Sequence, residues 1–162
     1  MANWEMVELQ RYSGDCRKVV EEIVRIEKRL FPKHESLAKS FEQEVKKRNC
    51  GLLYSLIGDE IAGYVMYSWP SSLYASITKL AVKENYRRQG HGEALLKAAI
   101  ERCKTRNIHR ITLHVDPSRI EAMNLYKKLG FQMECTMLKW QSIDAHALPL
   151  FVISVATMYF ES

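Results

Sequence analysis

The sequence contains little glycine, proline or cysteine, and it has no long uninterrupted apolar run. Its 162 residues include seven glycines, four prolines and four cysteines, and 27% of them are charged. This composition argues against a disordered, collagen-like or disulfide-stapled chain. The most apolar stretch, residues 147–156, is shorter than the roughly 20 residues that a membrane-spanning helix needs. We therefore expect one soluble globular domain over residues 1–162, with no membrane partner.

The four cysteines are widely separated, and none belongs to a Cys-x-x-Cys pair of the kind that binds zinc. We expect reduced thiols and no metal site, which favours a reducing compartment. Residues 1–5 show neither the basic and apolar segments of a signal peptide nor the character of a transit peptide. The predicted location is the cytoplasm, with the nucleus as a further compartment.

The excess of positive charge is modest, at a formal net charge of +5. Such a balance suits an anionic ligand. The densest basic run, residues 46–48, lies at the end of a predicted helix, where the helix dipole favours cations. No basic stripe is interleaved with aromatic residues, so we expect no nucleic-acid partner.

Residues 87–92, Arg-Arg-Gln-Gly-His-Gly, carry the strongest chemical signal in the chain. An apolar run with strand character, residues 77–82, precedes them, and a helical pattern begins directly afterwards. Gly90 and Gly92 allow a tight turn whose backbone N–H groups point inward, and a side chain at either position should obstruct it. The unpaired N–H groups and positive dipole of the helix start face the same spot, which predicts a phosphate or pyrophosphate site.

The loop matches neither of two common phosphate-binding motifs. The third glycine of a Rossmann fingerprint would fall at Leu95, and no Gly-Lys-Ser/Thr follows as in a P-loop. Turn chemistry alone could place two glycines before a helix. The full pattern of strand, Arg-x-x-Gly-x-Gly and helix resembles the acyl-CoA pyrophosphate loop of the GNAT superfamily of N-acetyltransferases.

A second motif supports this resemblance. GNAT proteins typically carry Asn-x-x-Ala-x-x-x-Tyr-x-x-x-Gly-Phe after the strand that follows the helix of the CoA loop. Ala122, Tyr126, Gly130 and Phe131 match this motif at the right spacing, whereas Arg119 stands where asparagine is usual. Two motifs in the correct order make the resemblance specific.

The periodicity of the apolar residues predicts the element order β-α-α-β-β-β-α-β-α-β-β, which is the GNAT order. The fold class implied is α/β, with a mixed, centrally splayed β-sheet flanked by helices. The resemblance is evident over residues 52–131 and strong from residue 79 onward. The predicted segments are a strand near 6–9, a helix over 15–30, a helix capped by Ser36 that reaches Val45, strands over 52–57, 61–67 and 76–82, a helix over 92–106, a strand over 110–115, a helix over 120–129, a strand over 131–135 and a strand within 147–156.

The resemblance implies a binding mode for acetyl-CoA. Its pantetheine would pair with the backbone of residues 80–82 as an added strand would, and its pyrophosphate would lie on the amides of residues 88–93. The acetyl carbonyl would point toward an N–H near Leu80 or Ala81, which would stabilise an oxyanion. The implied cofactor-binding residues are Leu80, Ala81, Val82, Arg87, Arg88, Gln89, Gly90, His91, Gly92, Glu93 and Tyr126.

The same resemblance assigns the general acid to Tyr126. The alternative is a tyrosine that merely packs at the edge of the core. An unperturbed tyrosine pKa of ~10 would suit protonation of a thiolate whose conjugate acid has a pKa of ~8.5.

The sequence identifies the general base less directly than the general acid. Many family members that acetylate lysine carry glutamate on the central strand, and that position, counted back from Val82, is Ser76. His114 is the best replacement, because Leu113-His114-Val115 resembles the catalytic segment of some protein N-terminal acetyltransferases and histidine titrates near neutral pH. The alternative is a strand histidine without a catalytic role. Weaker candidates for the base are Tyr74, Glu84 and His109.

The segment Leu30-Phe31-Pro32 resembles the loop that lines the acceptor site of some N-terminal acetyltransferases, and residues 143–148 resemble a late strand of the same subgroup. Phe31 and Pro32 are the residues expected to contact the acceptor. An α-amino group has a pKa of ~7.7–8.0, against ~10.4 for lysine, so it needs only a weak base. We therefore expect the N-terminal amine of a protein or peptide as acceptor. The alternatives are a lysine, a small-molecule amine, or a regulatory subunit that binds acyl-CoA without turnover. The sequence leaves the oligomeric state open.

Overall fold

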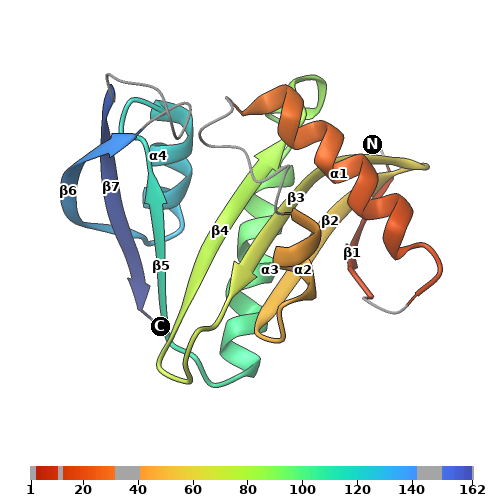
Figure 1. Ribbon diagram of the computed structural model, residues 1–162, viewed down its shortest axis with the longest axis horizontal. Helices are drawn as coiled ribbons and strands as arrows, with labels where there is room; N and C mark the ends of the chain where they lie inside the picture. Colours follow the sequence, from red (N-terminus) through yellow and green to blue (C-terminus); the bar gives the residue numbers. More distant parts are fainter. Residues whose placement is uncertain (1–2, 11–12, 32–40, 142–150, 162) are drawn as a thin grey trace.

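The computed structural model describes residues 3–10, 13–31, 41–141 and 151–161, and it contains one seven-stranded sheet with helices on both faces (Figure 1). The spatial strand order is β1-β2-β3-β4-β5-β7-β6. The predicted element order and fold class are confirmed. The strands are β1 Trp4–Glu8, β2 Cys50–Ile57, β3 Glu60–Ser68, β4 Tyr74–Val82, β5 Arg110–Val115, β6 Gln132–Gln141 and β7 Phe151–Glu161, and the helices are α1 Cys16–Leu30, α2 Phe41–Lys46, α3 His91–Thr105 and α4 Ile120–Lys128.

Several boundaries differ from the prediction for local reasons. Helix α3 begins at His91, because Gly90 adopts the left-handed conformation at its N-cap. Strand β6 extends to Gln141, well past the predicted end, because it pairs with β7 along its whole length. The predicted cap at Ser36 and the predicted segment 143–148 lie outside the described residues.

The sheet splits between β4 and β5, which are its parallel pair. Their pairing runs from Tyr74↔Arg110 to Ile77↔Leu113. At the next residue of β4, the register with β3 shifts, and the Thr78 hydroxyl donates to the Met66 carbonyl at 2.9 Å. A bulge bends a strand and strengthens its twist, which turns the rest of β4 away from β5. The predicted splay therefore has a local cause at Thr78.

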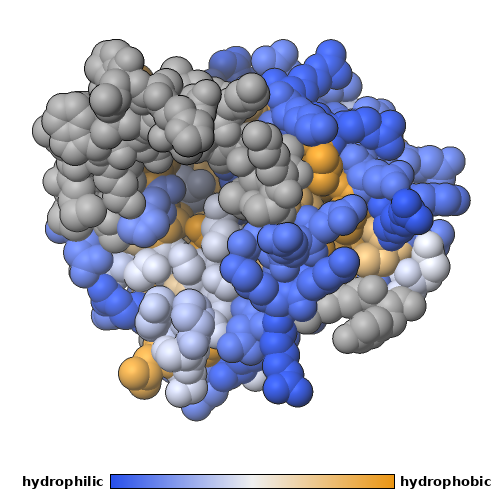
Figure 2. All heavy atoms as spheres, viewed as in Figure 1, coloured by the Kyte–Doolittle hydropathy of each residue, from blue (hydrophilic) through white to orange (hydrophobic). Residues whose placement is uncertain are grey.

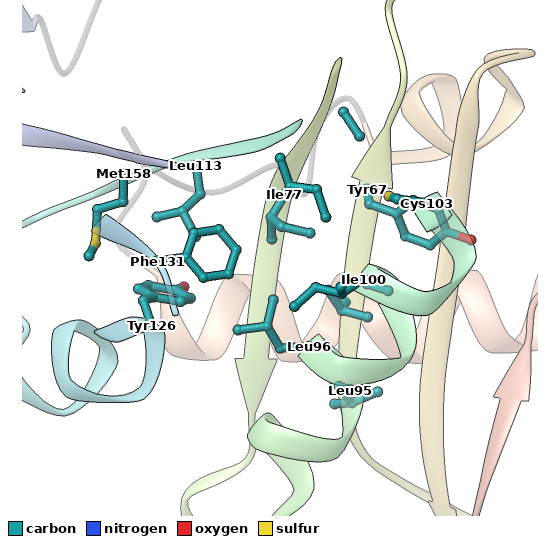
Figure 3. Packing of buried hydrophobic residues seen from close by; sticks show 14 of the residues in the cluster. Tyr67, Ile77, Leu95, Leu96, Ile100, Cys103, Leu113, Tyr126, Phe131 and Met158 are labelled. Carbon is teal, nitrogen blue, oxygen red and sulfur yellow. The ribbon is translucent and has the colours of Figure 1, made fainter. Parts of the chain in front are cut away.

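The core lies in two layers, one on each face of the sheet. On one face, α3 and α4 cover a cluster that includes Leu96, Leu113 and Tyr126, and Figure 3 shows these side chains gathered around Phe131. On the other face, α1 and α2 cover a second cluster that contains Ile23. Hydrophilic residues dominate the surface seen in Figure 2, and apolar atoms show mainly in the hollows between them. No helix among the described residues is both long and apolar enough to cross a membrane.

Candidate active site

A cavity of about 790 Å³ opens where β4 separates from β5. It connects the N-terminus of α3 with the side chain of Tyr126 on α4, and it also reaches the end of α1. Its walls therefore come from three helices and the second half of β4. The lining residues are Leu30, Phe31, Leu80, Ala81, Val82, Tyr86, Arg87, Arg88, Gly90, His91, Gly92, Glu93, Arg119, Ile120, Glu121, Ala122, Asn124, Leu125 and Tyr126.

The cavity brings together ten of the eleven residues predicted to bind the cofactor, and it adds Phe31 from the predicted acceptor site. Gln89 is the exception, because its side chain is exposed and its amide donates to the Asn85 carbonyl at 3.3 Å. Pro32 lies outside the described residues. Leu30, from the same predicted segment as Phe31, also lines the cavity. Sequence patterns missed Tyr86 and the exposed side of α4, since their place on the wall depends on tertiary contacts.

The N-terminus of α3 forms one end of the cavity. Gly90 has φ +88°. In the first helical hydrogen bond of α3, the Ala94 N–H donates to the Gly90 carbonyl at 3.0 Å. The backbone N–H groups before Ala94 belong to the first turn of α3, where N–H groups have no acceptor within the helix. The helix dipole also favours an anion at this N-terminus. The expectation that both glycines are conformationally required is wrong for Gly92. A Cβ there would make only ordinary contacts, 3.4 Å from Leu125 Cδ2, with no positive φ.

The charges around this end are paired across several elements. Glu93 bridges Lys97 on its own helix at 3.0 Å and Lys128 on α4 at 2.9 Å, and the hydrogen bond from Lys128, followed by that from Lys97, holds the pKa of Glu93 below its ordinary value. Arg88 contacts Glu121 at 3.2 Å. Both members of this second pair are highly exposed, so it contributes little to stability and leaves Arg88 available to an anion.

The ring of His91 is buried, although the residue lines the cavity. Its imidazole is 1% exposed and packs 4.6 Å from the Trp4 ring and 6.2 Å from the Tyr86 ring. Neither ring nitrogen has a hydrogen-bond partner among the described residues. Burial accordingly lowers the pKa of His91. The side chain is part of the packing around the start of α3, and only the backbone of His91 is placed to meet an anion.

This burial predicts a stability loss in acid that a His91→Leu variant should lack. A lowered pKa in the folded state means that the unfolded chain takes up the proton first, so stability is complete above the unfolded pKa of ~6.5 and falls as the pH drops below it. Between pH 6.5 and pH 5 the contribution is at most about 2 kcal/mol, at 1.36 kcal/mol per pH unit for one proton. Urea unfolding of both proteins across this range measures the difference.

The exposed His109, which contacts Asn107 at 3.0 Å, supplies a matched control for this measurement. A His109→Leu variant should lose stability in acid in parallel with the parent. If the His91→Leu variant also follows the parent, the buried imidazole does not cause the acid sensitivity.

Tyr126 lines the cavity from α4. Its ring packs 5.8 Å from the Phe131 ring, and the residue is 8% exposed (Figure 3). Burial raises the pKa of Tyr126 to about 12, while the charge of Arg119 opposes this rise. The expected ordinary tyrosine pKa is therefore wrong, because desolvation disfavours the phenolate. The hydroxyl stays protonated throughout the neutral range and can donate a hydrogen bond.

His114 does not line the cavity. Leu113 and Val115, its neighbours on β5, both point into the cluster that holds Tyr126, so the alternation of a strand directs His114 to the opposite face. The side chain is exposed there, opposite Thr157 of β7. The two predicted catalytic residues therefore lie on opposite faces of the splayed sheet.

A buried polar network supports Phe31 on the wall of the cavity, and sequence patterns did not reveal it. The Lys79 ammonium lies 3.7 Å from the centroid of the Phe31 ring and 3.9 Å from the Glu27 carboxylate. Glu27 is fully buried and accepts a hydrogen bond from the Tyr64 hydroxyl, and burial followed by the Glu27 charge raises the pKa of that tyrosine. The network fixes Phe31 at the C-cap of α1, where the chain turns extended.

No cluster of three or more potential metal ligands occurs within the described ranges. A model of the acetyltransferase (GNAT) family matches residues 18–131, which include the loop before α3, strand β5 and helix α4. The match covers most of the cavity lining and extends from α1 to the end of the second sequence motif.

Curated relatives and solved structures agree with this match. An N-alpha-acetyltransferase of Sulfurisphaera tokodaii is 30% identical over 125 residues, covering 70% of this chain and 74% of that protein. Another curated relative, from Bacillus subtilis, matches over 58 residues, which span only 38% of its length. The structure of the ribosomal-protein-S18-alanine N-acetyltransferase from Escherichia coli superposes with a TM-score of 0.79 at 20% identity, covering 98% of this chain and 94% of that one. The structure of Arabidopsis thaliana NAA60 in complex with acetyl-CoA superposes with a TM-score of 0.78 at 16% identity, covering 98% of both chains.

Proposed function

This chain belongs to the GNAT family of acetyltransferases, and we propose that it transfers the acetyl group of acetyl-CoA to the α-amino group of a protein or peptide. The observation that carries this proposal is the single cavity that joins the N-terminus of α3 to Tyr126 along the free edge of β4. Its 790 Å³ fits the usual size of a cofactor site.

The cavity offers each part of acetyl-CoA a suitable partner. The helix start at Gly90 supplies backbone N–H groups to the pyrophosphate, with Arg87 and Arg88 beside it. Residues 80–82 pair with β3 on one side only, since the pairing with β5 ends at Ile77. Pantetheine amides can therefore bond to the other edge of β4 as an added strand.

The opposite placement of His114 and Tyr126 suits a direct displacement. The amine attacks the thioester carbon, a C–N bond forms, and the C–S bond breaks with its electron pair going to sulfur. His114, directly or through a water molecule, accepts the proton from the attacking nitrogen on one face of the sheet. Tyr126 supports the leaving sulfur from the other face. Acetyl-CoA is the co-substrate, and the reaction needs no metal.

Two arguments favour an α-amino acceptor. The relatives named above as N-alpha-acetyltransferase and as alanine N-acetyltransferase support that class of substrate. The chemistry also fits, because Ser76 stands where lysine-acetylating relatives carry a glutamate base. An amine with a pKa of ~7.7–8.0 is partly neutral at pH 7 and can react with only weak base assistance.

Peptides with a free amino terminus should therefore be acetylated much faster than the same peptides blocked at the terminus and bearing lysine. The lysine amine is ~2.5 pKa units harder to deprotonate, which predicts a difference in kcat/KM of about 300-fold at neutral pH. A CoA-release assay over a peptide library with varied first residues measures both rates and the sequence preference. Equal rates would reject the N-terminal acceptor. Acetyl-CoA binding without turnover of any amine would favour the regulatory alternative.

The same assay tests His114 as the base. A His114→Ala variant should lower kcat/KM for free-terminus peptides about a hundredfold, the lower end of the usual contribution of a general base. The rate of the parent should fall at low pH, where both His114 and the amine are protonated. His109→Ala is measured beside it, because His109 is also exposed and outside the cavity and is one of the weaker candidates for the base. It should leave kcat/KM unchanged if His114 is the group that takes the proton. A pH profile unaltered by His114→Ala would show that another group takes the proton.

A further inference from the structure

Arg119 occupies the position where the second GNAT motif has asparagine, and we propose that its guanidinium stabilises the thiolate of CoA as it leaves. The inference rests on the proposed function only in requiring that the cavity binds acetyl-CoA. It does not depend on which amine is the acceptor.

The geometry places the Arg119 charge on the wall of the reaction cavity. Arg119 is the N-cap residue of α4, seven positions before Tyr126, and both residues line the cavity. Its guanidinium carbon lies 5.4 Å from the centroid of the Phe31 ring, so the side chain extends from the start of α4 to the end of α1. An asparagine is too short to make that crossing.

Four other charged side chains line the cavity. Arg87 and Arg88 belong to the loop before α3, and Glu121 contacts Arg88. Glu93 is held by Lys97 and Lys128.

Two further charged groups lie close to Arg119. Asp116, in the turn before α4, accepts hydrogen bonds from the Ser118 N–H and hydroxyl, and these bonds, followed by the Arg119 charge, lower the pKa of Asp116. Lys79 shares the Phe31 ring with Arg119, although its ammonium faces the buried Glu27. Arg119 itself lines the cavity together with Tyr126, and its charge acts on the Tyr126 hydroxyl.

The chemistry of the leaving group gives this cation a role. The thiolate carries the electron pair of the broken C–S bond, and a thiol has a pKa of ~8.5. Tyr126, with a pKa of about 12, is too weak an acid to transfer its proton completely to that sulfur. It donates a hydrogen bond instead, so the negative charge remains largely on sulfur. A preorganised cation in a partly desolvated cavity stabilises such a charge in the transition state.

The direct test is the pKa of the CoA thiol bound to the protein. Thiolate absorbance in the ultraviolet is followed against pH with bound CoA, and bound acetyl-CoA, which has no free thiol, serves as the blank. The parent should bind CoA with a thiol pKa below that of free CoA. Arg119→Gln should raise it by about one unit toward the free value, and Arg119→Lys, which keeps the charge, should retain most of the depression.

Kinetics supply the second readout. Arg119→Gln should lower kcat about 10- to 100-fold while the Kd for acetyl-CoA stays within threefold, and Arg119→Lys should recover much of the loss. Arg106→Gln is the matched control, because that arginine stacks 4.0 Å from the Trp69 ring outside the cavity and should leave kcat unchanged.

An unchanged thiol pKa in Arg119→Gln would overturn the proposal. So would a loss confined to the KM of the acceptor, which would make Arg119 an acceptor-binding residue. The thiol titration uses no amine, so failure of the N-terminal acceptor assignment would leave its result intact.

Discussion

A Tyr126→Phe variant is expected to lose about a hundredfold or more in kcat while its affinity for acetyl-CoA stays almost unchanged. The substitution keeps the ring, which packs against Phe131, and deletes only the hydroxyl. Acid assistance contributes typically 10²–10⁴-fold. The raised pKa limits full proton transfer, which favours the lower end of this range. Steady-state kinetics with a saturating peptide, together with calorimetric titration of acetyl-CoA, separate catalysis from binding.

Tyr67 provides the matched control for this experiment. It is also a buried tyrosine with a pKa raised by burial to about 12, and it does not line the cavity. Its hydroxyl has no hydrogen-bond partner among the described residues, so Tyr67→Phe should be stable and fully active. Tyr126 would be a packing residue if its variant kept kcat within about threefold of the parent, as the Tyr67 variant should. The alkaline limb of the rate profile below pH 11 should also be independent of Tyr126, because its hydroxyl remains protonated there.

Local patterns predicted the parts of the fold that local physics determines. The apolar period of α1 and its end at the extended residue Phe31 follow directly from the sequence. The left-handed Gly90 at the start of α3 likewise has a local cause, since glycine is the residue that adopts this conformation without strain. The splay between β4 and β5 was implied only by resemblance. Its cause, the bulge at Thr78, depends on a register with β3 that no single segment encodes.

The candidate site shows the same division between local and tertiary information. The sequence motifs predicted that Tyr126 and the loop before α3 belong to one site, and both line the cavity. Each motif is a short strand-to-helix or helical unit, so local patterns suffice to find it. The support of Phe31 by Lys79, Glu27 and Tyr64 joins elements far apart in the chain, so no spacing rule predicts it. The raised pKa of Tyr126 was missed for a related reason. It results from burial of the side chain, and burial depends on tertiary packing that the local sequence does not specify.

Replacing Gly90 by valine is expected to weaken acetyl-CoA binding at least tenfold, and this is the most direct test of the anion site. A Cβ at Gly90 would meet no heavy atom within 4 Å, so the new side chain would not clash with the fold. It would instead occupy open space at the cavity wall, over the N-terminus of α3. The positive φ adds strain of about 1–2 kcal/mol, which is the cost of the left-handed region for a residue with a Cβ.

Gly58 allows the strain to be separated from the loss of binding. It also has a positive φ, +60°, and open space around a Cβ, but it lies in the β2–β3 turn outside the cavity. Gly58→Val and Gly90→Val should therefore lose comparable unfolding free energy in urea. Only Gly90→Val should bind acetyl-CoA more weakly, as measured by calorimetric titration of the folded proteins. Equal affinity in the two variants would place the pyrophosphate elsewhere, because no other difference between these glycines bears on an anion at the start of α3.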